Sequence, residues 1–382
     1  MPDTAGTLHT PDQLVVDLGH LPAVLATLER LGVRTGRDAS GSSAITVITE
    51  AAVEQEELLD LARITVLVDE DGDPLDLDDV LVALRHAFAA ERGGFVPTVG
   101  KNRFVDGVIG FGKRNTKPFD FEEPQPLADG ELPPQIPGPG SAGAGVRVGV
   151  VDTPLRPAPA ADPLDHRLGH ALFVDGLIRQ QAPGATVEHR GALDGPDGRG
   201  DSWTVARAIV ELGRSGIDVL NLSLGCYAPP DGPPLVVRRA IERVPRDVLV
   251  VAAAGNHGLF ANLAAARTPR SAIWPGALPP VVAVGAVRDD GTRPEWSPDL
   301  PWITCAAPGV GVASTYLDGD VQLTDGVQAF TGFARWSGTS FAAAVVSGAV
   351  AARTVPGQVS AHEALAAVLD EGTVARRFTA AR

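Results

Sequence analysis

Short apolar runs alternate with helical patterns over the C-terminal two thirds of the chain. Five segments, most of them rich in β-branched and small residues, have the length of strands, and they lie at 146–152, 186–193, 218–225, 248–255 and 281–287. Apolar residues recur with helical spacing between them, at 168–181 and 203–212. Because strands that alternate with helices form parallel sheets, this pattern predicts an α/β fold with a mostly parallel central sheet and helices on both faces.

The first 117 residues follow a different pattern, in which two strands and two amphipathic helices are expected. The expected strands are Gln13–Leu18 and Ala44–Thr49, and the expected helices are Leu21–Leu31 and Leu77–Phe88. The segment is acidic. We therefore predict a small α+β domain over residues 1–117.

A segment rich in proline and glycine separates these two patterns. Residues 118–145 contain seven prolines, a composition that cannot bury a core and is typical of an extended connector. The predicted organisation is an N-terminal domain at 1–117, a linker at 118–145, an α/β domain at 146–357 and a helical C-terminal tail at 358–382.

The stretch 330–351 contains the first candidate for chemistry. Its centre, Ser337-Gly338-Thr339-Ser340, is a glycine turn followed by small and β-branched residues without a charge, which predicts that Ser340 stands in the first turn of a buried helix. Backbone N–H groups are unpaired there and favour negative charge, so a serine with a base beside it loses its proton more readily. A lone serine in this position is more often a helix cap, and only a base and its orienting partner would make it a nucleophile.

Charge and composition exclude several classes of function. The chain has 32 lysine and arginine residues against 47 aspartate and glutamate residues, and a net charge of −15 argues against nucleic acid or an anionic membrane as the main partner. The longest apolar runs are far shorter than a membrane span. The first lysine or arginine is Arg30, so no usual secretory signal is recognisable and a cytoplasmic location is expected. Cys226 and Cys305 allow one disulfide bridge at most.

A serine nucleophile needs a base within hydrogen-bond reach, and the base needs a partner that orients it. His170 begins an apolar helix after Gly169, whereas His166 lies in a polar stretch and is expected to be exposed to solvent. Asp152 ends the first strand of the α/β segment, where it can accept a hydrogen bond from the His170 ring. Taken alone, a strand-end aspartate and a helix-start histidine are each more often structural.

Two further segments end at the same edge of the predicted sheet. Asn256 follows Gly255 at a strand end, where its NH₂ group can donate to a developing oxyanion together with the backbone N–H of Ser340. The competing interpretation is an asparagine favoured by the turn itself. Ser223-Leu224-Gly225 ends another strand, whose backbone can pair with an extended peptide.

In this order the segments resemble the motifs of bacterial subtilisin-like serine proteases, the subtilases, and the resemblance covers roughly residues 146–353. The matching segments are the aspartate motif Val150-Val151-Asp152-Thr153, the histidine motif Gly169-His170, the substrate strand Ser223-Leu224-Gly225, the oxyanion motif Ala253-Ala254-Gly255-Asn256 and the serine motif Gly338–Ala343. The resemblance implies a subtilisin-like fold.

The resemblance also implies a serine endopeptidase acting on a protein or peptide. Ser340 would attack the scissile carbonyl and His170 would carry its proton, while Asp152 orients the ring and Asn256 helps to hold the oxyanion. The residues expected to frame the substrate are Ser223, Leu224, Gly225, Ala253 and Gly255. Most are small or neutral, which is compatible with medium-sized apolar substrate side chains.

Several positions depart from the family pattern. Pro154 and Ala344 replace a glycine and a proline, and Ala171 and Leu172 replace the Gly-Thr pair that follows the histidine. An active endopeptidase is the leading hypothesis, and a catalytically weak subtilase fold that serves as a peptide-binding module is the alternative. Ester hydrolysis is a third hypothesis, although the chain has no Gly-x-Ser-x-Gly elbow.

The remaining expectations concern cofactors and the N-terminal domain. No dense Asp/Asn ligand loop is recognisable, so no cofactor or metal is expected, although the acidic composition allows calcium. Subtilases are often made with an N-terminal domain that assists folding and covers the active site until it is cleaved. Residues 1–117 suit that arrangement, with self-cleavage expected between about Pro118 and Gly145, or they are retained to recruit a partner.

Overall fold

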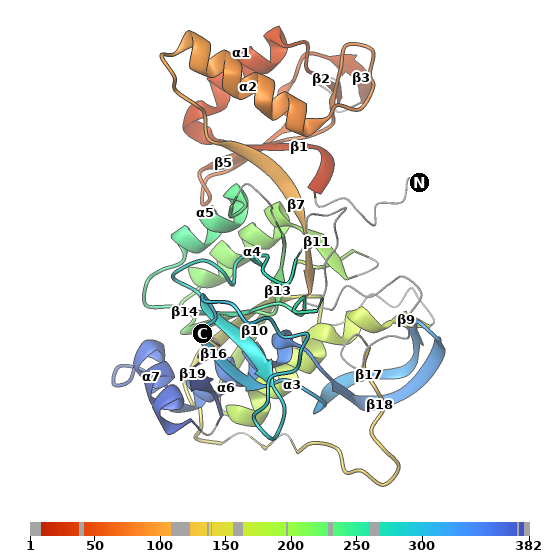
Figure 1. Cartoon of the computed structure of the whole chain (residues 1–382), viewed down its shortest axis with the longest axis vertical. Coiled ribbons are helices and arrows are strands. Elements are labelled where there is room, and N and C mark those ends of the chain that lie inside the picture. The colour runs from red at the N-terminus through yellow and green to blue at the C-terminus, as the bar shows by residue number, and fades with distance from the viewer. Residues whose placement is uncertain are drawn as a thin grey trace. The chain divides into compact units, whose positions relative to one another are not determined.

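The structure is a computed structural model, and it describes residues 9–37, 42–107, 123–135, 137–138, 140–155, 163–195, 198–227, 232–259, 268–372 and 374–377. The chain divides into two compact units, whose elements are labelled in Figure 1. The first unit comprises residues 1–104, 201–210 and 231–243. The second comprises residues 105–200, 211–230 and 244–382.

The first unit is built on an antiparallel sheet in which β7, β1, β5 and β4 are neighbours in that order. These strands are β1 (His9–Asp17), β4 (Val53–Glu56), β5 (Leu61–Ile64) and β7 (Val99–Gly107), the last of which contributes residues 99–104 to this unit. A second antiparallel sheet contains β2 (Arg34–Arg37), β3 (Ser43–Thr46) and β6 (Leu67–Val68). The short 3₁₀ helices η2 (Leu18–His20) and η3 (Glu50–Ala52) lie between strands.

Helices α1 (Leu21–Arg30) and α2 (Leu77–Glu91) cover the main sheet of the first unit. Each helix turns an apolar stripe toward one shared core, in which Leu28 and Phe88 pack against Leu14 and Ile64 of the strands. The α+β character predicted for the N-terminal part of the chain is therefore confirmed. The predicted boundary at residue 117 stays a prediction, because residues 108–122 lie outside the described part of the chain.

Two helices from later in the sequence belong to the first unit. They are α4 (Ser202–Gly213), through residues 202–210, and α5 (Leu235–Arg243). The indole N–H of Trp203 donates to Glu54 at 3.0 Å, and the Arg239 guanidinium lies 2.8 Å from the Asp17 carboxylate. Polar contacts between residues far apart in the sequence thus attach α4 and α5 to the N-terminal strands.

The second unit contains a seven-stranded sheet in the order β10-β8-β12-β14-β15-β16-β19. Its strands are β8 (Arg147–Asp152), β10 (Thr186–Gly191), β12 (Val219–Leu222), β14 (Leu249–Ala253), β15 (Val282–Val287), β16 (Cys305–Pro308) and β19 (Arg376–Arg377). The described pairs are parallel except β16 with β19, which is antiparallel. The predicted α/β fold with a mostly parallel central sheet is therefore confirmed.

Three helices pack in the core of the second unit: α3 (His170–Gln181), α6 (Thr339–Arg353) and α7 (Ala361–Glu371). Every residue of α6 from Thr339 to Ala351 is buried, as its uncharged sequence predicts. The rings of Phe173 on α3 and Phe341 on α6 lie 4.5 Å apart between centroids and hold the two helices together. No helix in the described residues has the length and apolarity needed to cross a bilayer.

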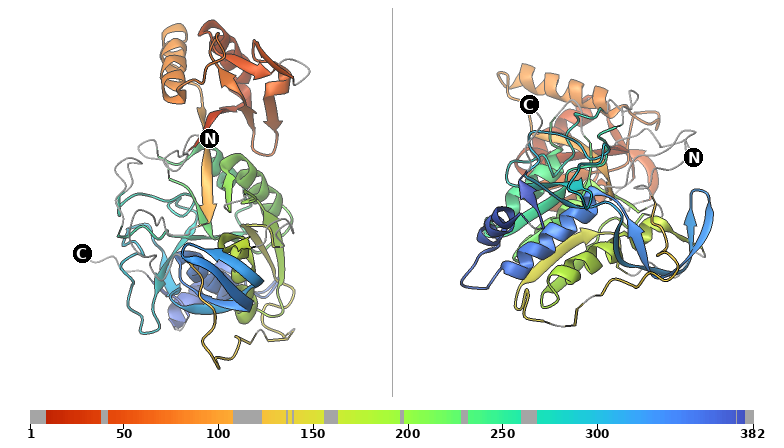
Figure 2. Two further views of the ribbon diagram at one scale, coloured as in Figure 1. Left: turned by 90° about the vertical axis from the view of Figure 1, so that its right-hand side faces the viewer. Right: turned by 60° about the horizontal axis from the view of Figure 1, so that its bottom comes forward.

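A long antiparallel hairpin was not anticipated from the sequence. It consists of β17 (Val312–Leu323) and β18 (Gly326–Trp336), and Figure 2 shows it in blue beside α3. Short β9 (Leu164–Asp165) pairs in parallel with β17 and leads into the 3₁₀ helix η4 (His166–Gly169). The Thr315 hydroxyl donates to the Leu172 carbonyl at 2.7 Å, which attaches the hairpin to α3.

The hairpin also overturns the expectation that His166 is exposed to solvent. His166 is only 7% exposed, and its backbone carbonyl accepts a hydrogen bond of 2.6 Å from the Tyr316 hydroxyl. The Trp336 ring of β18 lies 6.3 Å from the imidazole, centroid to centroid. Burial lowers the pKa of His166 below its usual value. The polar neighbours of His166 in sequence gave no sign of this cover, because it comes from residues 150 or more positions away.

Candidate active site

The end of β8 and the start of α3 bring Asp152 and His170 into direct contact. The Nδ1 atom of His170 lies 2.7 Å from Oδ1 and 2.9 Å from Oδ2 of Asp152, and both side chains are 1% exposed. A carboxylate only accepts hydrogen bonds, so in the neutral tautomer that fits this contact Nδ1 carries the proton and Nε2 keeps its lone pair. Nε2 is buried and has no hydrogen-bond partner among the described residues. In this arrangement Nε2 can act as a base that takes a proton from a neighbouring hydroxyl.

Thr153 ties the two elements together at this point. The Thr153 amide donates to Oδ1 of Asp152 at 2.7 Å, and its hydroxyl accepts from the Ala171 amide at 3.1 Å. The amide of Ala171 is one of the unpaired donors at the start of α3, so Thr153 caps the helix that carries His170. Ala171, which departs from the family pattern, is itself fully buried, and Leu172 packs against the core.

Aromatic side chains restrict the His170 ring on its other sides. The ring centroids of Phe341 and Trp336 lie 5.5 Å and 5.9 Å from the imidazole, and Trp336 meets it edge-on. A Cβ atom on Gly169 would come within 2.2 Å of the Tyr316 ring, so only glycine fits before the histidine. These contacts limit the positions that the imidazole can take.

Ser340 occupies the first turn of α6, as predicted, and is fully buried. Its Oγ donates to the Ser223 carbonyl at 3.2 Å, and the Ser223 hydroxyl donates to the Ser340 carbonyl at 2.8 Å. Phe341, the next residue, contacts the His170 ring. Ser340 is therefore hydrogen-bonded to the substrate strand, and its neighbour Phe341 contacts the predicted base.

Two buried residues that sequence reasoning missed extend this network. The side-chain amide of Asn221 donates to the Ser223 hydroxyl at 2.9 Å, and its oxygen accepts from the Ser347 hydroxyl at 2.9 Å. All of these side chains are fully buried, so each polar group depends on the next for its hydrogen bond. The available signal was an asparagine in an otherwise apolar strand and a serine in an otherwise apolar helix.

Asn256 is oriented by the turn that precedes the nucleophile. Its Oδ1 accepts from both the amide and the hydroxyl of Thr339 at 3.0 Å, and the same hydroxyl accepts from the Gly255 amide at 3.0 Å. With the oxygen engaged by Thr339, the Nδ2 atom lies beside Gly338, 3.5 Å from where a Cβ on that glycine would be. Gly255 has a φ of +103°, which a residue with a side chain rarely adopts.

The predicted peptide-binding strand is paired with another segment of this chain. In β13 (Leu224–Gly225), Leu224 faces Gly107 and Gly225 faces Asp106 in an antiparallel register, all four within the second unit. The Asp106 carboxylate is held by the Arg199 guanidinium at 2.5 Å, at the edge of β11 (Arg199–Asp201). The backbone of Leu224 and Gly225 thus pairs with an extended segment of this chain.

Beside this strand lies a small apolar cluster of Ala253, Tyr227 and Ile273. A Cβ on Gly225 would come within 2.6 Å of the Ile273 side chain, so the cluster packs directly against the substrate strand.

Neither cysteine forms the disulfide bridge that the composition allowed. Cys226 and Cys305 are both free and buried, and burial raises the pKa of Cys305 to about 12. Over the described residues, no group of three or more His, Cys, Asp or Glu side chains is placed to hold a metal ion.

Sequence comparison relates this chain to known proteases. The model of the Subtilase family matches residues 160–369, which include His170, Asn256 and Ser340 but not Asp152. Subtilisin BL from Lederbergia lenta is 30% identical over 233 residues, which cover 56% of this chain and 77% of that protein. Mycosin-3 from Mycobacterium tuberculosis is 28% identical over 274 residues, covering 55% of this chain and 59% of that protein.

Structural comparison extends the likeness to the whole fold. Fervidolysin from Fervidobacterium pennivorans, a keratinolytic enzyme related to subtilisin, aligns with a TM-score of 0.56 and 16% identity, covering 91% of this chain and 55% of fervidolysin. At that identity the likeness concerns the fold alone. The family match, by contrast, spans more than half of the sequence. With its parallel sheet, its paired aspartate and histidine and its buried serine, this chain belongs to the subtilase family of serine endopeptidases.

Proposed function

We propose that the chain cleaves peptide bonds with Asp152, His170 and Ser340 as a catalytic triad, and with Asn256 and the Ser340 amide as the oxyanion hole. The observation that carries the proposal is the 2.7 Å contact between the Asp152 carboxylate and Nδ1 of His170. It fixes the tautomer in which Nε2 accepts a proton. Protein or peptide substrates follow from membership of the family.

In the proposed reaction, Oγ of Ser340 attacks the scissile carbonyl carbon while Nε2 of His170 takes the hydroxyl proton. Asp152 stays ionised and stabilises the imidazolium that forms. The carbonyl oxygen becomes an oxyanion, which accepts hydrogen bonds from Nδ2 of Asn256 and from the Ser340 amide. His170 then gives its proton to the leaving amine, and water releases the acyl group from Ser340 through the same steps in reverse.

Labelling with a fluorophosphonate probe tests the proposal most directly. We expect the wild-type protein to be labelled at Ser340, as located by peptide mass, and the Ser340→Ala variant to remain unlabelled. A folded wild-type protein that resists the probe would favour the alternative of a peptide-binding module with little catalytic activity.

Replacing Asn256 with alanine is expected to lower kcat by roughly 10²–10³-fold with little change in KM. The NH₂ group donates to the oxygen only once negative charge develops, so its loss affects the transition state more than substrate binding. Steady-state kinetics on a peptide substrate measures both constants. A wild-type kcat in a correctly folded Asn256→Ala protein would mean that another donor fills the oxyanion hole.

We also propose that the N-terminal segment is a propeptide rather than a recruitment domain. The antiparallel pairing of Asp106 and Gly107 with Gly225 and Leu224 supports this, because an extended substrate would use the same backbone groups. Because Asp106 and Gly107 already pair with the substrate strand, the residues that follow them are the ones presented for cleavage. We therefore expect the cut shortly after Gly107, earlier than the Pro118–Gly145 window that composition alone suggests.

Intact mass measurement tests the propeptide. The purified wild-type protein is expected to cut itself shortly after Gly107, whereas the Ser340→Ala protein should stay at full length. The separated N-terminal fragment should inhibit the catalytic domain when it is added back. An active wild-type protein that remains uncut would rule out the propeptide and leave recruitment of a partner as the role of this segment.

A further inference from the structure

The first unit contains a pocket that the proposed peptidase chemistry does not use. Its volume is about 380 Å³, within the range of roughly 300–1,000 Å³ that is typical of small-molecule sites. All of its lining residues belong to the first unit: Leu81, Arg85, Val96, Pro97, Thr98, Val99, Gly100, Lys101, Arg103, Gly232, Pro233, Pro234, Leu235 and Arg238. Four of these residues are basic and none is acidic, although the chain has a net charge of −15.

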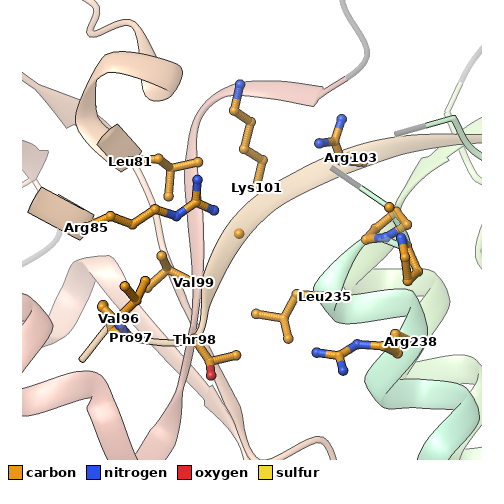
Figure 3. A pocket seen from close by; sticks show the side chains of 14 residues that line it. Leu81, Arg85, Val96, Pro97, Thr98, Val99, Lys101, Arg103, Leu235 and Arg238 are labelled. Atoms are coloured by element: carbon orange, nitrogen blue, oxygen red, sulfur yellow. The ribbon is translucent and has the colours of Figure 1, made fainter. Parts of the chain in front are cut away.

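The four basic side chains come from three elements that meet around the pocket. Arg85 lies on α2, Lys101 and Arg103 lie on β7, and Arg238 lies on α5. Figure 3 shows Arg85 and Arg238 on helices at the two sides of the strand that carries Lys101. A Cβ on Gly100 would approach Leu235 to 3.2 Å, so β7 and α5 are in close contact here. Like charges are therefore held together by the packing of the elements around them.

The acidic partners of Lys101, Arg238 and Arg85 differ in number and distance. Lys101 is 5% exposed and pairs with Asp78 at 2.6 Å, whereas Arg238 has Glu242 at 3.7 Å on an exposed helix face. An exposed pair at that distance contributes little. Arg85 has no ion pair within the described residues. Burial lowers the pKa of His9 beside Lys101, and the charges of Lys101 and Arg103 lower it further, whereas the Thr10 backbone and Asp78 raise it.

From this arrangement we infer that the pocket binds a small organic polyanion, bridged between Arg85 on α2 and Arg238 on α5. Guanidinium groups match the oxyanions of phosphates and carboxylates, to which they can donate two parallel hydrogen bonds. The apolar side chains of Leu81, Val96, Val99 and Leu235 offer contact area to the carbon skeleton of such a ligand. A polyanion bound in this way pairs with both arginines and joins α2 to α5.

Isothermal titration calorimetry on the full-length Ser340→Ala protein tests the site without interference from self-cleavage. The probes are inorganic pyrophosphate, citrate and inorganic phosphate, each at constant ionic strength. We expect one saturable site for a polyvalent anion and weaker binding of phosphate. Preference for pyrophosphate indicates a phosphate-bearing ligand, and preference for citrate indicates a polycarboxylate. Because a ligand that binds only the folded state stabilises it, Tm should rise with the same probe.

Substitutions of the two arginines test where the anion binds. Arg85→Ala and Arg238→Ala should each lower the affinity for the preferred anion by about tenfold or more, because each removes charged hydrogen bonds. Arg85→Lys should retain part of the affinity. The matched control is Arg30→Ala, which removes one exposed arginine of the same unit and should leave binding unchanged.

A chemical measurement on the unmutated side chains avoids any dependence on how the variants fold. The same anion should protect Arg85 and Arg238, but not Arg30, from phenylglyoxal, as read by peptide mass. Absence of saturable binding by all three probes, or protection that does not distinguish these arginines, would overturn the inference.

Discussion

Replacing either Ser340 or His170 with alanine is expected to remove nearly all turnover, and replacing both should remove little more. The proton that leaves Oγ of Ser340 has to reach Nε2 of His170, so each residue is of little use without the other. We expect kcat to fall by a factor on the order of 10⁶ in each single variant and in the double variant. Initial rates on a peptide substrate, normalised to folded protein by circular dichroism, measure this loss.

Matched controls for this experiment lie in the same unit. Ser215→Ala removes a hydroxyl that, among the described residues, bonds only to the Leu212 carbonyl of its own turn, and His362→Ala removes an exposed histidine on α7. Both should retain wild-type kcat. Losses that multiply in the double variant of Ser340 and His170 would show that the two residues act independently, which contradicts a shared proton transfer.

Replacing Asp152 with asparagine is expected to have the second large effect, a loss of about 10⁴-fold in kcat. Asparagine keeps the size of the side chain but offers an NH₂ group where the carboxylate accepted two contacts from Nδ1 at 2.7 and 2.9 Å. It therefore favours the opposite tautomer of His170, with the proton on Nε2, where the ring cannot act as a base. The amide also loses the negative charge that stabilises the imidazolium in the transition state.

The chain offers a closely matched control for this substitution. Asp175 of α3 accepts from Nε2 of His189 at 2.9 Å, in a second largely buried aspartate–histidine pair. Asp175→Asn should lower Tm but leave kcat close to wild type, because this pair lies outside the proposed triad. Steady-state kinetics, the rate of fluorophosphonate labelling and thermal denaturation are measured on both variants. If Asp152→Asn keeps more than a tenth of the wild-type kcat, another group orients His170.

The local properties of the sequence predicted the elements that carry the site. Apolar runs bounded by glycine or an acid specified β8, β12, β14 and β15, because a strand buried on both faces needs little more than β-branched residues. The uncharged stretch after Gly338 likewise specified a buried α6. Since the carboxyl ends of parallel strands meet at one edge, the positions of Asp152 and Asn256 followed from the same pattern.

The hairpin β17–β18 was missed because its two strands have different surroundings. Tyr316 and Phe330 are buried in the core, while the residues around Val327 are exposed, so neither strand shows one clear periodicity along its length. No local sequence pattern therefore indicates that the hairpin contributes to the active site. Tyr316 and Trp336 restrict Gly169 and His170 through contacts between residues far apart in the chain.

By itself the sequence determined the subtilase fold class and the identity of the candidate triad, since both depend on residue types at set positions within continuous segments. Tertiary structure alone decided the burial of His166, the chain of hydrogen bonds through Asn221 and Ser347, and the assignment of α4 and α5 to the first unit. It also decided the pairing of Gly107 with Leu224 and the gathering of Arg85 and Arg238 around one pocket. The physical reason is that a hydrogen bond, a shared cavity or a strand register belongs to two segments at once, and neither segment carries a local sign of its partner.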